Sequence, residues 1–510
     1  MSKRYEFNDD SVVVVVGSGA GGGTVSNELA QKGVDVVCLE AGNRLSLADV
    51  VNDAAVMDGK MGWHDKRNGA PVWLCKTVGG TTMRWSGVTP RLRDFEFRPR
   101  STYAALNGTN LIDWPLTLEE LSPYYDKAEA KMGVSGTHGT PASFETSNFK
   151  VLKAGGQRLG YQQITSERMA INSVARDGRP ECQQIGFCWS GCAVSAKWST
   201  LYTEIPKAEQ TGHFELRTGA MALKIEHDDN GKVRSVVYVD SGGVVREQKA
   251  RAVCVAGNVV ETTRLLHNSS SNLFPEGLGN GSGHLGRNYM RHVMSLTLGI
   301  MPGEVNFHRG TRQSGIILDE QRHDDSRGFA GGYIIETIAD QPYSIAALIG
   351  GWGKETADFL ENYSRVAGCW ITGEDPPEAH NRITFHDTER DAYGLPVPVL
   401  EYSQHANSVA MQQHAAQQCE AIYTSLGAKR VESRPDIGGG CHNMGVARMS
   451  ERPADGVTNR WGRLHEMPNL FVSDGSLFPS SAAPNPTLTI VALAIRQAEH
   501  IADAMVRHEL

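Results

Sequence analysis

The chain has 510 residues, of which 40% are hydrophobic and 21% charged, a composition typical of a globular protein long enough for two domains. Its net charge of −8 argues against a nucleic-acid partner, and no apolar run approaches the roughly 18 to 20 residues that span a bilayer. The segment before residue 11 is polar and shows no secretory signal, so we expect a cytoplasmic protein, or a periplasmic one if a signal-bearing partner exports it.

The first predicted unit is a strand, a glycine-rich turn, a helix and a second strand. Five valines at 12–16 predict a buried parallel strand, and they lead directly into Gly-Ser-Gly-Ala-Gly-Gly at 17–22. Gly33 ends the following amphipathic helix, and residues 34–39 predict a second strand that finishes at Glu40. This β-α-β unit, with its glycines and its acid in place, predicts a bound cofactor that contains ADP.

The residues of this turn have separate expected roles. Gly17 permits the tight turn, Gly19 lets backbone N–H groups approach a pyrophosphate, and Gly22 lets the helix pack on the strand. Ser18 belongs to the phosphate-binding turn, and Glu40 would accept a hydrogen bond from a ribose hydroxyl. The alternative, a glycine-rich turn in an ordinary βα unit, leaves Glu40 unexplained.

Nine cysteines are scattered along the chain except for one cluster, Cys182, Cys188 and Cys192. An odd count without a regular framework argues against a disulfide scaffold. A tight loop with buried thiols, or with one disulfide, is one interpretation of the cluster. Zinc is less favoured, because no C-x-x-C pair and no fourth ligand are evident.

Two later segments repeat the pattern of a strand that ends in a turn. Residues 252–257 predict a strand followed by a helical stretch at 261–266, and residues 469–475 predict a buried strand that ends in a polar turn. Asn485 and Pro486 then predict a helix start, with Asn at the N-cap and Pro at the first helical position. The cofactor domain is therefore predicted to be discontinuous, with a second domain inserted into it.

Four motifs together resemble one known family. They are the unit at 17–42, Val-Gly-Gly-Thr-Thr at 78–82, His-x-x-Gly-x-x-Arg-Met at 442–449 and Asn-Pro-Thr-Leu-Thr at 485–489. In order and in coverage of the chain they are similar to the glucose–methanol–choline (GMC) oxidoreductases. The resemblance implies FAD rather than NAD, and an α/β fold in which a discontinuous Rossmann-like FAD-binding domain carries an inserted α+β substrate-binding domain.

The expected domain limits follow the composition of the segments between these motifs. The FAD-binding domain would comprise residues 1–90, 212–295 and 432–510, and the substrate-binding domain residues 91–211 and 296–431.

The second motif most resembles that of bacterial sugar dehydrogenases and pyranose oxidases, in which it runs along the flavin ring. The resemblance implies flavin contacts for Gly79, Gly80, Thr81, Arg84, Trp85 and Ser86, with Ser86 near the flavin N5 edge. Several relatives join a histidine covalently to the flavin at the position of Arg84, so the resemblance implies non-covalent FAD here. Arg84 would pair with a phosphate or with negative charge on the reduced flavin, or it is an ordinary exposed arginine.

Further cofactor contacts are implied at the end of the chain and in its middle. Asp474 and Gly475 match the family's second phosphate or ribityl contact, and Ala222 falls where the family holds adenine through its main chain. The last helix, which starts at Pro486 and Thr487, would direct its positive end toward the flavin.

The family's catalytic base matches His442, and the hydrogen-bonding partner of that base matches Asn485. Neutral imidazole suits the role because its pKa lies near working pH, and an amide can hold the same substrate oxygen without competing for the proton. We therefore expect oxidation of a primary or secondary alcohol, a sugar or glycoside hydroxyl by preference. The proton would go to His442 and the hydride to flavin N5. A structural histidine and an Asn-Pro helix cap are the alternatives.

The route by which electrons leave stays open in the sequence. Cys182, Cys188 and Cys192 match the spacing that binds a 3Fe-4S cluster in some dehydrogenases of the family, but Ala193 stands where those members usually carry Pro. The spacing favours a dehydrogenase with a small subunit or another electron-accepting partner over an oxygen-using oxidase. A redox-silent FAD lyase and a non-catalytic flavoprotein subunit are further alternatives.

The sequence does not identify the substrate, because no motif anchors the inserted domain. Four tryptophans are candidates for stacking on a sugar or an aromatic ring: Trp63, Trp73, Trp352 and Trp370. For each of them we expect core packing instead.

Overall fold

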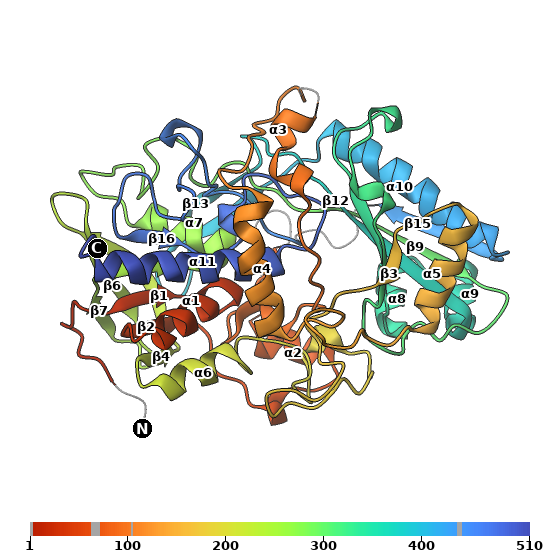
Figure 1. Ribbon diagram of the computed structural model, residues 1–510, viewed down its shortest axis with the longest axis horizontal. Helices are drawn as coiled ribbons and strands as arrows, with labels where there is room; N and C mark the ends of the chain where they lie inside the picture. Colours follow the sequence, from red (N-terminus) through yellow and green to blue (C-terminus); the bar gives the residue numbers. More distant parts are fainter. Residues whose placement is uncertain (1–3, 63–71, 104–105, 436–440) are drawn as a thin grey trace.

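The computed structural model describes residues 4–62, 72–103, 106–435 and 441–510. Two sheets dominate the molecule: a parallel sheet in the left half of Figure 1 and an antiparallel sheet in the right half. The expected α/β architecture, in which a parallel Rossmann-like sheet is joined to a second α+β part, is therefore confirmed.

The parallel sheet has five strands in the order β16-β8-β1-β2-β4, collected from separate parts of the chain. Its strands are β1 (Val13–Val16), β2 (Val36–Glu40), β4 (Phe214–Thr218), β8 (Ala252–Val255) and β16 (Leu470–Val472). Successive valines of β1 face two different cores, with Val14 in one cluster of buried side chains and Val13 and Val15 in the other. Because the sheet is covered on both faces, its central strand is apolar at every position.

Helices cover the parallel sheet. They are α1 (Ala20–Gln31), α4 (Leu118–Met132), α6 (Glu204–Thr211), α7 (Asn258–Asn268) and α11 (Thr487–Val506). The α11 helix contacts α1 and α4, which crosses it in Figure 1, and α1 also contacts α6. Both α4 and α6 lie within residues 91–211, which we expected in the inserted domain. The division of the chain into two domains stays a prediction.

The helix after Asn485 begins one residue later than predicted. Pro486 is the N-cap of α11 rather than its first helical residue, and no side chain caps this end. The prediction that Asn485 is the helix cap is therefore wrong, and its amide remains available to the cavity beside it.

The antiparallel sheet has six strands in the order β15-β9-β12-β11-β10-β3. Its strands are β3 (Ile164–Ser166), β9 (Val293–Ile300), β10 (Gly315–Ile317), β11 (Tyr333–Thr337), β12 (Val366–Gly373) and β15 (Arg430–Pro435). Two helices that contact each other, α5 (Ser147–Arg158) and α10 (Ala406–Ser425), pack on it. Every residue of β9 and β12 is buried, which makes these strands the core of the second half.

The remaining elements are smaller. A three-stranded sheet consists of β5 (Met221–His227), β6 (Val233–Val239) and β7 (Val245–Lys249), and a hairpin consists of β13 (Arg382–Arg390) and β14 (Pro396–Glu401). Short helices are α2 (Ala54–Lys60), α3 (Pro99–Thr102), α8 (Pro342–Ile349) and α9 (Lys354–Glu361). Short 3₁₀ helices lie at Leu47–Asp49, Gly80–Met83, Asp94–Phe97, Cys188–Ser190, Asp319–Gln321, Asp325–Arg327, Tyr363–Arg365, Pro453–Asp455 and Gly475–Leu477. Among the described helices, none combines the length and the apolar composition needed to cross a bilayer.

Candidate active site

One deep cavity begins at the carboxyl ends of the parallel strands and reaches the antiparallel sheet, with Val16, Glu40 and Val255 at its strand end and Trp370 of β12 at the other. Most of the predicted site residues line it: Gly17, Ser18, Gly19, Glu40, Gly80, Thr81, Arg84, Trp85, Ser86, Ala222, His442, Asp474, Gly475, Asn485, Pro486 and Thr487. Gly22 and Gly79, which we also predicted, lie outside the lining. The fold thus brings into one cavity four motifs that are far apart in the sequence.

The glycine-rich turn leaves the start of α1 open toward this cavity. Gly17 adopts φ +93°, and Gly19 is the N-cap of α1 with no side-chain capping bond, so the first N–H groups of the helix are available to an anion. A Cβ at Gly21 would lie 1.5 Å from the Ser473 carbonyl oxygen, and one at Gly22 would lie 2.0 Å from the Gly17 carbonyl oxygen. Gly22 therefore serves packing, as predicted, and Gly21 has the same role.

Glu40 organises the turn from the end of β2. Its Oε2 accepts hydrogen bonds from the Ser18 N–H at 3.0 Å and the Ser18 hydroxyl at 2.6 Å, and its Oε1 accepts one from the Gly42 N–H at 2.9 Å. Burial raises the pKa of Glu40, and these hydrogen bonds oppose that shift. The Ser18 hydroxyl in turn accepts a hydrogen bond from the Gly79 N–H at 3.1 Å. Ser18 therefore joins the first motif to the second; the ribose contact of Glu40 stays a prediction.

The second motif passes along the cavity as a 3₁₀ turn. Gly79 adopts φ +96°, and a Cβ there would lie 2.8 Å from the Ser199 hydroxyl. Arg84 is 7% exposed and is ion-paired with Asp58, and burial lowers the pKa of its guanidinium to about 10. The interpretation of Arg84 as an ordinary exposed arginine is therefore wrong. Ser86 accepts a hydrogen bond at 2.9 Å from the indole N–H of Trp189.

His442 and Asn485 line the same cavity, from different segments. His442 Nδ1 lies 2.8 Å from Nδ1 of His292, a residue that sequence reasoning did not single out. Burial, and then the neighbouring His292 ring, lower the pKa of His442 well below its usual value. Asn485 is 5% exposed, and among the described residues its Oδ1 has no hydrogen-bond partner, so it can bind a ligand.

A buried carboxyl group lies behind this pair. Glu336 of β11 accepts hydrogen bonds from the Gln313 amide at 3.0 Å and from the Trp370 indole N–H at 2.9 Å. Burial raises the pKa of Glu336 to about 7, and hydrogen bonds from Trp370, Gln313 and Asn485 oppose the rise. Gln313, Trp370 and Asn485 all line the cavity. Glu336 lies outside the lining and interacts with these three side chains from behind.

The expectation of core packing holds for Trp370, which belongs to the buried core of the second half, and Trp73 packs against that core. The expectation is wrong for Trp352. Trp73, Trp189 and Trp370 line the cavity, whereas Trp352 is 94% exposed. Trp63 lies outside the described residues. Trp73 and Trp189 form an edge-to-face pair with centroids 4.7 Å apart, and Trp189 lies 6.1 Å from Trp370. The cavity thus has an aromatic wall, of which Trp189 had no signal in the sequence.

The three clustered cysteines line a second, small cavity together with Lys197. All three are free thiols, so the structure does not support the disulfide interpretation. The Lys197 ammonium donates hydrogen bonds to the carbonyls of Cys188 at 2.6 Å, Trp85 at 2.6 Å and Met83 at 3.1 Å. Because Trp85 and Trp189 belong to the first cavity, the cysteine cavity adjoins it.

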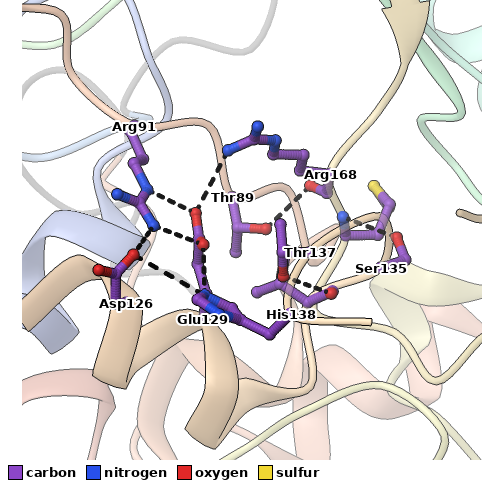
Figure 2. Close-up of polar contacts among 10 residues, drawn as sticks. Thr89, Arg91, Asp126, Glu129, Ser135, Thr137, His138 and Arg168 are labelled. Atoms are coloured by element: carbon purple, nitrogen blue, oxygen red, sulfur yellow. Dashed lines mark hydrogen bonds and ion pairs between the residues drawn. The ribbon is translucent and has the colours of Figure 1, made fainter. Parts of the chain in front are cut away.

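Among the described residues, one trio of His, Cys, Asp or Glu side chains has its ligand atoms within 4.8 Å of one another: Asp126, Glu129 and His138. Figure 2 shows that Arg91 and Arg168 already bind these carboxylates. Arg91 donates hydrogen bonds to Glu129 at 2.6 and 2.7 Å and to Asp126 at 2.6 Å, and Arg168 donates one to Glu129 at 3.4 Å. The trio is an ion-pair network rather than a metal site. The three thiols, which lie farther apart, are too distant for a single ion to bind all of them.

Two family models, both described as GMC oxidoreductase, match residues 5–294 and 377–494. The chain is 32% identical to paromamine 6'-oxidase from Streptomyces fradiae, covering 98% of this chain and 93% of that protein. It is 30% identical to 2-methyl-1,2-propanediol dehydrogenase from Mycolicibacterium austroafricanum, covering 97% and 95%. It is 26% identical to the fructose dehydrogenase large subunit from Gluconobacter japonicus, covering 96% and 97%.

The fold is similar to solved structures of low sequence identity. A formate oxidase from Aspergillus oryzae superposes with a TM-score of 0.72 at 13% identity, covering 99% of this chain and all of that one. At this identity the likeness concerns the fold alone.

Proposed function

The chain belongs to the GMC oxidoreductase family, whose FAD-dependent members oxidise alcohol groups, and we propose that it is a dehydrogenase acting on a sugar or glycoside hydroxyl. One observation carries the proposal. A single cavity has an open helix N-terminus and Glu40 at one end, and His442 and Asn485 beside an aromatic wall at the other. FAD, when bound, supplies the hydride acceptor.

The residues present fit an FAD that is held without a covalent bond. The N–H groups at the start of α1 and of the turn at Asp474–Gly475 suit its phosphates, and Ala222 offers main-chain groups at the adenine end. The space beside Gly19 is open toward the cavity, because a Cβ there would meet only the Gly80 Cα, at 3.8 Å. Arg84 has no nucleophilic nitrogen at neutral pH, which supports non-covalent binding.

His442 would act as the base. Because burial and the His292 ring hold its pKa well below the usual value, the imidazole is neutral at neutral pH and can accept the hydroxyl proton. The Asn485 amide would orient the substrate oxygen, and Glu336 would hold that amide in place from behind. Proton removal and substrate orientation are thus assigned to two side chains that line the same cavity.

The aromatic wall supports a sugar or glycoside as the substrate. Trp73, Trp189 and Trp370 line the cavity with indole surface on which the C–H face of a sugar could pack, while Gln313 offers hydrogen bonds to its hydroxyls. Two relatives carry names that point the same way, paromamine 6'-oxidase and fructose dehydrogenase.

We further propose that Cys182, Cys188 and Cys192 would hold a 3Fe-4S cluster, which when bound would supply an electron acceptor other than oxygen. Three thiols around one cavity fit the ligand set of a 3Fe-4S cluster, and Trp189 connects them to the substrate cavity because it follows Cys188 directly. The similarity to a large subunit supports a small or electron-accepting partner. A cytoplasmic location, or a periplasmic one with an exporting partner, stays a prediction.

The test is the absorption spectrum of the purified protein before and after anaerobic addition of a panel of sugars and alcohols. We expect flavin bands that bleach with a sugar, over a broad iron–sulfur shoulder that Cys188→Ser removes. The same spectrum with His442→Gln should show flavin that no substrate bleaches. Flavin that no alcohol bleaches in the unaltered protein would overturn the redox function in favour of a lyase. Rapid reoxidation by air would overturn the dehydrogenase assignment in favour of an oxidase.

A further inference from the structure

The ring of His292, at the residue before β9, lies between His442 and the segment that leads to Asn485. Its Nδ1 lies 2.8 Å from Nδ1 of His442, and the two rings stand nearly perpendicular, at 83°. Its Nε2 lies 3.0 Å from the carbonyl oxygen of Ala482 and 3.4 Å from that of Ser481. His292 is 2% exposed, so water does not substitute for these partners.

The donors and acceptors of this chain fix where the hydrogens are. A carbonyl oxygen only accepts, so Nε2 of His292 carries a hydrogen. In a neutral ring Nδ1 of His292 then has a lone pair and must accept, and the hydrogen between the rings therefore sits on Nδ1 of His442. A neutral His442 with a hydrogen on Nδ1 has its lone pair on Nε2.

We propose that His292 is a positioning residue that selects Nε2 of His442 as the atom that takes the substrate proton. The proposal rests on the proposed function, because it assigns an atom and a partner to the base named there. As the hydroxyl O–H bond breaks, its electron pair stays on oxygen and the proton goes to Nε2. The imidazolium that forms keeps its Nδ1–H bonded to His292, which holds the ring in the same orientation during proton transfer.

The surroundings of His292 keep its ring neutral, as this assignment of hydrogens requires. Burial lowers the pKa of His292 to about 4, and the hydrogen bonds to the carbonyls of Ser481 and Ala482 oppose that shift only in part. The charged side chains nearest this segment, Arg291, Arg312 and Glu336, act on the neighbouring Cys441 thiol, whereas the His442 ring responds to burial and to His292. His292 is therefore neutral through the neutral pH range.

The carbonyls that hold His292 are themselves fixed. Ala482 adopts φ +53°, a conformation that L-residues rarely use. In this conformation its own carbonyl oxygen lies within hydrogen-bond distance of His292. Each neighbour in this loop is bonded to another element. The three bonds are Trp114 Nε1–H to the Ser480 hydroxyl at 2.8 Å, the Asp375 N–H to the Ser481 hydroxyl at 2.9 Å, and the Ala483 N–H to Glu96 at 3.0 Å. The loop that carries Asn485 thus also sets the orientation of His442, through His292.

Two variants separate hydrogen bonding from ring packing. His292→Asn keeps an oxygen that can accept the Nδ1–H of His442, whereas His292→Phe keeps the ring volume and removes the acceptor. In the FAD-loaded enzyme we expect His292→Phe to slow anaerobic flavin reduction by roughly 100-fold with KM within about three-fold. His292→Asn should recover most of the rate. Equal rates for His292→Phe and the unaltered enzyme would overturn the proposal.

A readout that does not depend on turnover uses histidine labelled with nitrogen-15 in the FAD-loaded enzyme without substrate. We expect the difference spectrum against His442→Gln to show Nε2 of His442 unprotonated and Nδ1 protonated, and His292→Phe to mix the two tautomers. A hydrogen on Nε2 in the unaltered enzyme would overturn the proposal even if the enzyme oxidises sugars. If the predicted tautomer is found but no alcohol is oxidised, the proposed function fails and the assignment of hydrogens stands.

Discussion

The two ends of the cavity are built in different ways. The cofactor end centres on the stretch 17–42, to which Ala222 and the Asp474–Gly475 turn are added, and it offers mainly main-chain groups beside glycines such as Gly21 and Gly22 that cannot carry a Cβ. The substrate end is assembled from side chains that lie hundreds of residues apart, including Trp73, Trp189 and His442. Substitutions at the cofactor end should therefore damage folding and FAD content, whereas substitutions at the substrate end should damage the reaction and leave the fold intact.

The largest effect should come from replacing His442, the proposed base. We expect His442→Gln to lower the rate constant of anaerobic flavin reduction by about 10³-fold while FAD content and melting temperature stay unchanged. In the unaltered enzyme that rate should be constant from about pH 8 to below pH 6, because only neutral His442 accepts a proton and its pKa is lowered. Stopped-flow absorbance measures the rate constant of the variant and the pH dependence of the rate in the unaltered enzyme. If the His442→Gln variant instead loses its FAD, the role of His442 is structural, like that of the glycines at the cofactor end.

The matching substitution at the cofactor end is Gly21→Ala. Its Cβ would lie 1.5 Å from the Ser473 carbonyl oxygen, which is backbone and cannot rotate away. We expect unfolding free energy to fall by about 3 kcal/mol and the purified protein to have lost most of its FAD. The control is Gly59→Ala in α2. An added Cβ there would meet no neighbouring atom within 4 Å, so stability should hold or rise slightly. Urea unfolding and the flavin absorbance of both variants check this, and equal stability would contradict it.

The same contrast explains what the sequence could predict. The unit from Gly17 to Glu40 is local: hydrophobic period, glycine spacing and the acid all lie within one β-α-β unit, and the structure has those elements in place. His442 and Asn485 emerged only through resemblance to a family. His292 and Glu336 had no signal, because their roles depend on how β9 and β11 pack behind the cavity.

The boundary at Asn485 shows a smaller limit of the same kind. An Asn-Pro pair before an apolar helix predicts a cap, but the loop from Ser480 to Ala483 is tied to other elements and α11 starts after Pro486. Local preference at the Asn-Pro pair therefore predicts the helix but misplaces its first residue by one position.

Glu336 tests whether the substrate end is optimised for function at the expense of stability. Its pKa is raised to about 7 by burial, so between about pH 4.5 and 7 the unfolded chain ionises this group while the folded chain keeps it protonated, and stability falls as pH rises. At pH 8 we expect Glu336→Gln to be more stable than the unaltered protein by about 1 kcal/mol, and the difference to vanish near pH 4.5. Urea unfolding at both pH values measures this, with sugar turnover recorded alongside. A variant that is less stable at pH 8 would contradict it.

The smallest expected effect concerns the aromatic wall, and it decides whether that wall binds substrate. Trp189→Phe keeps a ring in the cavity but loses the indole N–H that donates a hydrogen bond to the Ser86 hydroxyl. The contact of Arg312 with the ring face can persist. If the substrate packs on this wall as proposed, one hydrogen bond and part of one stacking surface are lost, so KM should rise about three-fold, with kcat within two-fold. Trp461→Phe is the control, since Trp461 stacks on His500 outside the cavity and its loss should leave KM unchanged. If both variants raised KM equally, the effect would reflect general loosening of the fold. If neither did, the wall would serve packing, and the substrate end would reduce to His442, Asn485 and the residues that position them.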